Sequence, residues 1–387
     1  MEIPPGHTRF GDRSYVLKLK KSIYGLKQSG RNWYTHITEV LKGIGFVTSE
    51  YCPCVFRLNN ECLILLYVDD IAVFAKNDRI MNKFFQALNS HYEVTNLGPI
   101  QTLLGVEFES VKDTVHLHQK KYIKKLLEQF CVSSTDVVVS TPMEVGTVYS
   151  QNLDATDKPY RALLGSLLFL ASRTRPDIMF SVIYFAQFSS HPIDEHWYGL
   201  LRILKYVANT LEYSIDLSTA SSNDLTMYSD ASWATALDTR RSFSGYIWSL
   251  GGVCLGWRTS IQRCVAKSTM ESEYIALDLA VSEIVWISNV VNECEGFPFC
   301  DLKPLVLCDN QAAMAFVQNK MVNNRTKHID VRYHAVCELL CDGKFIMRYI
   351  GTKLNIADLL TKPLLKSKLI GFVNTIFKES VVVKGGV

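Results

Sequence analysis

Two groups of acidic residues have the type and spacing that metal-dependent phosphate chemistry requires. The first is the adjacent pair Asp69 and Asp70, which has apolar residues on both sides, at 63–66 and 71–74. These flanks predict a tight hairpin turn between buried strands, with both carboxylates at the edge of a core. Charges there are costly unless a cation neutralises them, and oxygen ligands suit Mg²⁺ or Mn²⁺. Because Asp-Asp is also an ordinary turn pair, the pattern leaves both interpretations open.

The second group contains four acids, each placed beside a predicted strand or on a predicted helix. They are Asp230, Glu273, Asp309 and Asp358. Asp230 and Asp309 follow the predicted strands 225–229 and 305–308, and the carboxyl ends of strands in α/β sheets are where sites form. Taken singly, each acid also fits a helix cap, a turn or a solvated helix face. We therefore expect a shared site from the set of four and not from any one member.

Several basic residues are candidates for contacts with a nucleic-acid backbone. They are Lys121 and Lys124 on a predicted helix, Arg240 and Arg241 on a predicted turn beside Asp230, and Arg325 and Lys327 near a predicted helix start. Contacts of such side chains with phosphate give affinity without sequence preference, and a helix start also favours phosphate. A solvated charged surface is the alternative. Trp233 and Trp257 are expected in the core rather than as platforms for base stacking.

The apolar pattern predicts two α/β parts with a helical segment between them. Strands are predicted at 55–58, 63–67 and 71–75, helices at 81–88 and 120–130, and a hairpin of 103–109 with 114–117. Residues 131–158 and 218–224 are polar and predict linkers around the largely helical segment 160–208. Beyond 224, strands come first and helices then alternate with strands up to a closing helix from Ile356, which is typical of a mixed α/β domain.

Composition restricts the class of protein without deciding the function. The chain has 387 residues, 48% of them hydrophobic, and a net charge of +3, so it has ample material for a core and is only mildly basic. Its eleven cysteines form no regular framework, which favours reduced thiols in an intracellular protein. The first residues show no signal peptide, and the longest apolar run, 62–75, is too short for a membrane span and is interrupted by Asp69 and Asp70.

The segment Tyr67-Val68-Asp69-Asp70 resembles the metal-binding box of reverse transcriptases, and further motifs are similar to those of copia-type retrotransposon Pol polyproteins. The matching segments are 17–28 and 31–34 for the template grip, 103–106 for the primer grip, and 160–161, 165–168, 174–178 and 202–206 for the connecting region. The resemblance runs from about residue 2 to residue 364. It implies a DNA/RNA template–primer as partner, with Lys27 and Gln28 among its contacts.

The resemblance also implies a fold class of α+β and α/β parts in four segments. These are a truncated reverse-transcriptase palm with thumb at 1–130, a connection region at 131–222, an RNase H-like mixed-sheet domain at 223–364 and a C-terminal tail at 365–387. In the family, a further catalytic Asp lies on a strand N-terminal to the segment that resembles 17–28, and this sequence begins after that strand. Two-metal phosphoryl transfer needs more fixed ligands than Asp69 and Asp70 provide. We therefore expect the polymerase half to be inactive unless a longer precursor supplies the missing N-terminal part.

The four acids of the C-terminal half resemble the four-acid site of copia-type RNases H, and the segments 240–246 and 325–334 also match. The resemblance implies that these acids hold two Mg²⁺ ions, for which Mn²⁺ can substitute, and that an RNA–DNA hybrid is the substrate. Glu273 fits the family's Glu-x-x-Ala pattern, whereas Glu271 is two residues out of register. A His that precedes the fourth acid in many RNases H is absent, and Ile350 to Lys353 stand in its place.

The sequence therefore predicts an RNA–DNA hybrid ribonuclease joined to an incomplete RNA-directed DNA polymerase. An inactive transposon remnant and a non-catalytic nucleic-acid-binding module are the alternatives. The family also implies cytoplasmic replication particles and the nucleus as the places where such a protein acts.

Overall fold

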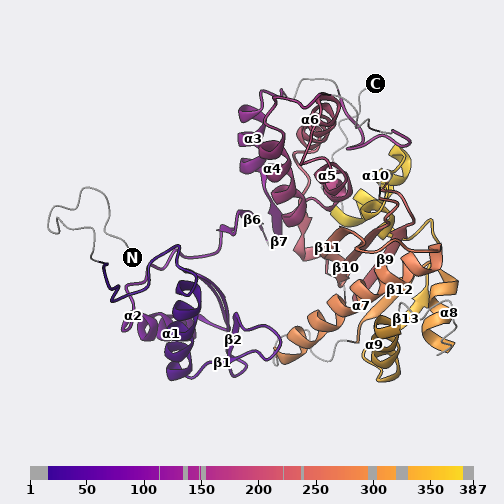
Figure 1. The fold of residues 1–387 in the computed structure, drawn as a ribbon. Helices are drawn as coiled ribbons and strands as arrows, with labels where there is room; N and C mark the ends of the chain where they lie inside the picture. Colours follow the sequence, from indigo (N-terminus) through magenta and orange to yellow (C-terminus); the bar gives the residue numbers. More distant parts are fainter. Residues whose placement is uncertain are drawn as a thin grey trace. The chain divides into compact units, whose positions relative to one another are not determined.

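The protein forms two compact units in the structure, which is a computed structural model. It describes residues 16–112, 114–133, 138–147, 149, 154–220, 222–236, 239–294, 303–319 and 330–377. The N-terminal unit contains Met1–Gly98 and Asn292–Cys300, and the C-terminal unit contains Pro99–Val291 and Asp301–Val387 (Figure 1). This division differs from the four predicted segments, whose names and roles stay predictions.

The described part of the N-terminal unit up to Gly98 contains one antiparallel sheet and two helices. The strands are β1 (Val47–Thr48), β2 (Val55–Leu58), β3 (Cys62–Tyr67) and β4 (Asp70–Ala75), in the order β1-β2-β3-β4, and the helices are α1 (Ser29–Ile44) and α2 (Asp78–Asn89). Ile64 and Leu66 of β3 pack into a core with both helices, whereas Leu65 and Tyr67 are exposed. The strands that were expected to be buried are buried on one face only, because their side chains alternate between the core and solvent.

The C-terminal unit begins with a small antiparallel sheet and four helices. The strands are β5 (Thr102–Leu103), β6 (Val106–Val111), β7 (Thr114–His118) and β8 (Ile215–Asp216). The helices are α3 (Lys120–Gln129), α4 (Tyr160–Arg173), α5 (Met179–Ala186) and α6 (Asp194–Asn209). The predicted hairpin and the predicted helix after it are confirmed, with ends that differ by a few residues.

A mixed five-stranded sheet follows. Its strands are β9 (Leu225–Ser232), β10 (Phe243–Leu250), β11 (Val253–Ile261), β12 (Leu305–Cys308) and β13 (Ile346–Tyr349), in the order β11-β10-β9-β12-β13. The pairs β11-β10 and β10-β9 are antiparallel, while β9-β12 and β12-β13 are parallel. Three helices accompany it, α7 (Thr269–Glu293), α8 (Gln311–Asn319) and α9 (Asp330–Cys341), and α8 packs against α9 (Figure 1). The predicted mixed α/β architecture is confirmed.

Helix α7 is the helix, among the residues that the structure describes, whose length and apolar composition would suffice to cross a membrane. The core helix of a folded domain has the same properties. Tyr274, Leu277, Ile284 and other side chains of α7 are buried within this protein. We therefore interpret α7 as a core helix of the C-terminal unit.

One hydrophobic core runs through the C-terminal unit from Ile123 in α3 to Phe377. The closing helix predicted from Ile356 is a short 3₁₀ helix, η4 (Ile356–Leu360), and a separate helix α10 (Lys366–Phe377) follows it. Because α10 buries Leu369, Phe372 and Phe377, the predicted tail begins with a packed helix. The core also contacts Trp257 on β11, as predicted, and its indole N–H donates to the Ala171 carbonyl of α4 over 2.8 Å.

A buried ion pair stands inside this core. Arg175, 1% exposed, donates from Nε to Asp177 Oδ1 over 2.9 Å and from Nη2 to Oδ2 over 2.7 Å. The guanidinium also donates to the Thr210 carbonyl over 3.2 Å and lies over the ring of Tyr213. The pair therefore joins the η1 turn (Pro176–Ile178) to the end of α6.

Candidate active site

Asp230 and Asp309 lie side by side toward the carboxyl ends of two neighbouring strands of the mixed sheet. Strands β9 and β12 run in parallel, and Ser229 pairs with Cys308, so the residues that follow these two are neighbours at the same end of the sheet. Asp230 is only 2% exposed, and Asp309 is half-buried. Asp309 directly follows β12, as predicted, whereas the prediction that Asp230 follows its strand is wrong, because β9 continues to pair with β10 up to Ser232.

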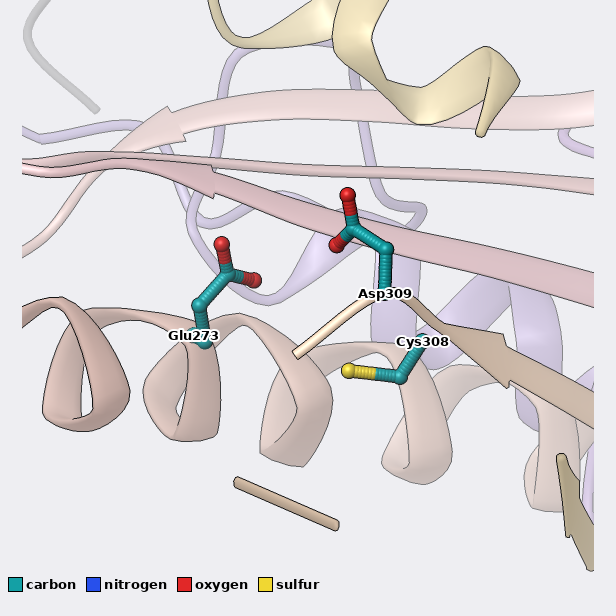
Figure 2. A group of neighbouring side chains, drawn as sticks. All are labelled: Glu273, Cys308 and Asp309. Carbon is teal, nitrogen blue, oxygen red and sulfur yellow. The ribbon is translucent and has the colours of Figure 1, made fainter. Parts of the chain in front are cut away.

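Glu273 reaches this end of the sheet from α7. Figure 2 shows the Glu273 and Asp309 carboxylates on the same side of the helix, with the Cys308 sulfur to one side of them. One ligand atom from each of these three residues lies within 4.8 Å of the other two. The helix is fixed to the sheet by Gln262, whose amide donates to the Ser272 carbonyl over 2.8 Å. Glu271 instead accepts a hydrogen bond from the Lys267 backbone N–H over 2.7 Å, at the start of α7.

Asp358 comes from η4, which packs across β9 and β10. The Asn355 amide donates to the Ser229 carbonyl over 2.9 Å and thereby attaches η4 to β9 beside Asp230. Asp358 is fully buried. The Thr361 hydroxyl, three residues further on, donates to Asp230. All four predicted acids therefore belong to one region of the C-terminal unit, and Asp358 lies on the Asp230 side of it.

The close packing of η4 depends on a glycine in β10. A Cβ at Gly245 would lie 2.7 Å from Leu360 Cβ and 2.8 Å from Thr361 Cγ2. We expect Gly245→Ala to destabilise the unit by about 1–3 kcal/mol, because overpacking displaces neighbours. Urea denaturation measures this change. Gly351→Ala, where a Cβ would meet no atom within 4 Å, is the control and should change stability by less than about 0.5 kcal/mol. Equal stability of the two variants would contradict the packing role of Gly245.

Two lysines neutralise part of the acidic charge. Lys362 Nζ lies 2.5 Å from Asp358 Oδ1 and 3.8 Å from Asp230 Oδ2. Lys368 Nζ pairs with the other oxygen of Asp358. The sequence reasoning did not identify these lysines as part of the site. The available signal was the spacing of Asp358 and Lys362, since an acid four residues before a lysine is a common ion pair on helical turns.

Burial and mutual repulsion control the protonation of the acids. Burial, followed by the charges of Asp230 and Asp309, raises the pKa of Glu273 to about 9. Burial also raises the pKa of Asp230 to about 6, while Lys362 acts in the opposite direction. In the absence of a metal ion, Glu273 therefore holds a proton at neutral pH.

These residues fit a hard divalent cation. Glu273 Oε2 is buried and, within the part of the chain that the structure describes, has no hydrogen-bond partner. A cation would supply the missing partner and remove the repulsion among the carboxylates. Cys308 suits such an ion less well, because burial raises the pKa of its thiol to about 12 and a neutral thiol is a poor ligand for Mg²⁺.

The predicted polymerase acids, Asp69 and Asp70, stand at the turn between β3 and β4, where Tyr67 pairs with Asp70. Val68 in this turn has a φ of 53°, a left-handed conformation that is unusual for a β-branched residue. The Trp33 indole N–H donates to the Val68 carbonyl over 2.8 Å and supports the turn. The Tyr24 hydroxyl donates to Asp69. Among the described residues, no third His, Cys or acid lies near enough to complete a metal-binding group here.

The predicted nucleic-acid contacts are distributed over both units. Lys27 and Gln28 are exposed at the start of α1, and Lys121 and Lys124 are exposed on α3. Arg240 and Arg241 are exposed in the connection between β9 and β10, at the end of the hairpin that carries Asp230. Arg325 and Lys327 lie outside the described residues.

The prediction that Trp233 lies in the core is wrong, because 45% of this residue is exposed and its indole N–H donates to the Ala266 carbonyl over 3.0 Å.

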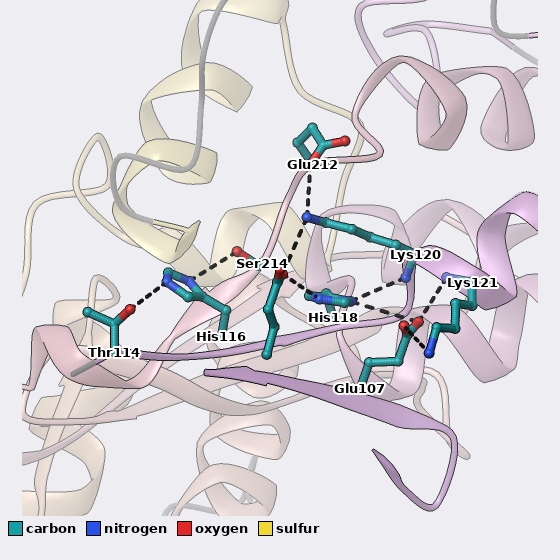
Figure 3. Close-up of polar contacts among 9 residues, drawn as sticks. Glu107, Thr114, His116, His118, Lys120, Lys121, Glu212 and Ser214 are labelled. Atoms are coloured by element: carbon teal, nitrogen blue, oxygen red, sulfur yellow. Dashed lines mark hydrogen bonds and ion pairs between the residues drawn. The ribbon is translucent and has the colours of Figure 1, made fainter. Parts of the chain in front are cut away.

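Not every lysine at the start of α3 is available to a ligand. Lys120 pairs with Glu212 over 2.9 Å and with Glu109 over 3.7 Å (Figure 3). The buried His118 ring lies between Glu109, at 3.0 Å, and Glu107, at 3.8 Å. Lys121 belongs to the same network, since its backbone N–H donates to Glu107 over 2.8 Å and its ammonium lies 3.8 Å from the same carboxylate, but 86% of its side chain is exposed. The network thus anchors the start of α3, and the exposed Lys121 ammonium remains accessible to a ligand.

Comparison with known proteins identifies the family. Residues 1–145 match the family model of the reverse transcriptase (RNA-dependent DNA polymerase). A retrovirus-related Pol polyprotein from transposon TNT 1-94 of Nicotiana tabacum is 34% identical over 95% of this chain and 28% of its own length. A putative transposon Ty5-1 protein of Saccharomyces cerevisiae is 31% identical over 73% of this chain and 94% of its own length.

A solved structure, LC11-RNase H1 from compost, aligns with 36% of this chain and 93% of its own, at 14% identity and a TM-score of 0.29. The chain spans about a quarter of the length of the Pol polyproteins that it matches. The family model and the transposon relatives match the family that the sequence motifs resemble. The chain therefore belongs to the Pol polyproteins of copia-type transposons.

Proposed function

We propose that the C-terminal unit hydrolyses the RNA strand of RNA–DNA hybrids in a Mg²⁺-dependent reaction. The observation that carries the proposal is the convergence of Asp230, Glu273 and Asp309 at one end of the mixed sheet, with a buried Glu273 oxygen that has no partner among the described residues. Asp358 adds a fourth carboxylate on the Asp230 side. Carboxylates in this number suit two divalent ions.

The protein's residues have distinct tasks in this proposal. Asp230, Glu273 and Asp309 would hold the metal, with Asp358 as the further ligand. Two bound Mg²⁺ ions supply an activated water and charge stabilisation for the leaving oxygen of the phosphodiester. Arg240 and Arg241, at the same end of the β9-β10 hairpin as Asp230, would bind phosphates of the hybrid. Lys121 and Lys124 would add non-specific affinity for the backbone.

For the N-terminal unit we propose binding of a template–primer without independent polymerisation. Asp69 and Asp70 form a pair of exposed acids, and two-metal catalysis needs more ligands than this pair provides. Lys27 and Gln28 are exposed and available for backbone contacts. Primer extension by the purified chain on a primed RNA template tests the idea, and extension above background would contradict it.

Cleavage of a hybrid with labelled RNA tests the nuclease proposal. We expect the wild type to cleave with Mg²⁺ or Mn²⁺, and Asp309→Asn to lose about 100-fold or more, because removing a metal ligand removes several kcal/mol of transition-state stabilisation. Asp342→Asn, the same change at an exposed acid of the same unit, is the matched control and should retain full activity. Absence of cleavage by folded wild type with both ions would refute the proposal and favour an inactive remnant. Hybrid binding that persists in EDTA without cleavage would instead favour a non-catalytic binding module.

A further inference from the structure

A positively charged side chain, that of Lys362, lies among the acids of the candidate active site. The Lys362 ammonium lies between two of the four acids, at 2.5 Å from Asp358 and 3.8 Å from Asp230. Both acids are buried, so the interaction is only weakly screened by water. An ammonium and a divalent ion cannot occupy the same space between these carboxylates.

The two lysines at Asp358 differ in what else they contact, although their side chains are similarly exposed, at 36% for Lys362 and 32% for Lys368. Lys368 pairs with one oxygen of Asp358, and its ammonium also lies over the Phe372 ring, 5.3 Å from the centroid, on the same packed helix α10. Lys362 follows η4 and lies over no ring among the described residues, but it pairs with Asp230 as well as with Asp358. Lys362 is therefore the lysine that bridges two acids.

The charges of the site are balanced by one divalent ion as long as both lysines are present. Asp230, Glu273, Asp309 and Asp358, when all are ionised, carry four negative charges, and Lys362 and Lys368 return two positive charges. The remaining two negative charges are balanced by one divalent ion. A second divalent ion would leave an excess of positive charge in a buried site, unless Lys362 leaves or an anionic phosphate arrives.

We propose that Lys362 is an internal competitor for one of the two divalent ions. The inference rests on the proposed metal-dependent function. Without nucleic acid, the ammonium occupies the space between Asp230 and Asp358, and the ion held by Glu273 and Asp309 binds first. The second ion binds weakly because it must displace Lys362. The lysine thereby makes full metal loading depend on the arrival of a phosphate backbone, which can receive both the ion and the displaced ammonium.

Titration of the metal-free protein with Mn²⁺, followed by the electron paramagnetic resonance signal of free Mn²⁺, measures both affinities without any turnover. We expect Lys362→Met to bind the weaker ion about tenfold more tightly than the wild type, because a charge that opposes the ion is removed. Lys362→Gln should behave similarly. Lys362→Arg keeps the charge and should keep the weak affinity. Lys353→Met, the same change in charge at an exposed lysine, should match the wild type.

The outcomes separate this inference from the proposed function. Mn²⁺ binding that Asp309→Asn abolishes supports the metal site, and unchanged affinities in Lys362→Met and Lys362→Gln would then overturn the competitor role alone. If the wild type binds no Mn²⁺ in excess of Asp309→Asn, both proposals fail. Thermal unfolding in EDTA identifies any variant that is not folded, and the two neutral variants provide independent tests.

Discussion

Asp177→Ala is expected to destabilise the C-terminal unit by about 3–5 kcal/mol, because it leaves the fully buried Arg175 guanidinium without its carboxylate. Both Asp177 oxygens accept from Arg175, and both side chains are buried. The loss should appear in urea denaturation monitored by circular dichroism, as a lower midpoint with a similar slope.

An exposed Arg–carboxylate pair with the same closest distance provides the control for this prediction. Arg202 and Glu144 approach within 2.7 Å, but 62% of the Glu144 side chain is exposed. Glu144→Ala should therefore cost no more than about 1 kcal/mol. Replacing both buried partners, as Arg175→Met with Asp177→Leu, should recover much of the loss, since it leaves no unpaired charge. A double variant as unstable as Asp177→Ala would show that packing, and not the orphaned charge, causes the effect.

Glu273→Gln is expected to abolish cleavage and yet to stabilise the metal-free protein above neutral pH. The folded-state pKa of Glu273 is about 9 without metal, against an ordinary value of 4.5. Between these values the unfolded chain has released the proton and the folded chain retains it. The wild type therefore loses stability as pH rises through this window, by at most about 1.4 kcal/mol per pH unit, and this contribution vanishes below the ordinary pKa.

Unfolding in EDTA at pH 5.5 and pH 8.5 measures this difference. The stability of the wild type should fall between the two pH values more steeply than that of Glu273→Gln, whose amide does not titrate. The Gln amide oxygen can still accept from the Ala231 backbone N–H, so the variant should fold. Added Mg²⁺ should stabilise the wild type, chiefly at the higher pH, because the ion requires ionised carboxylates. Parallel pH profiles of the two proteins would contradict the assigned environment of Glu273.

The acids of the candidate site were predicted only partly from local rules. Asp309 follows β12, whereas Asp230 lies within β9, two residues before its end, and both acids lie toward the carboxyl ends of neighbouring parallel strands. Glu273 was separated from Glu271 by the register of a family motif, and the structure gives the reason, since Glu271 is engaged at the start of α7. Local rules therefore drew attention to Asp230 and Asp309, whereas the choice of Glu273 depended on the resemblance to the family.

Other features depend on tertiary packing that no local pattern encodes. Lys362 and Lys368 reach Asp358 through long side chains, and Lys368 does so from a different helix. The exposure of Trp233 is likewise set by the neighbouring Ala266 loop. Helix α10 was predicted as part of a tail because the family resemblance ends at residue 364, yet its apolar side chains join the core of the C-terminal unit. Such contacts become visible only in three dimensions.

The shared core of the C-terminal unit has a consequence for how its parts can be inherited. The indole of Trp257 and the ring of Phe243 on the mixed sheet pack against α4 and α5, and α10 closes the same core. A recombination or deletion that separates the mixed sheet from these helices would expose apolar surface on both pieces. We therefore expect a rearranged element to keep or lose the mixed sheet and helices α4, α5 and α10 together.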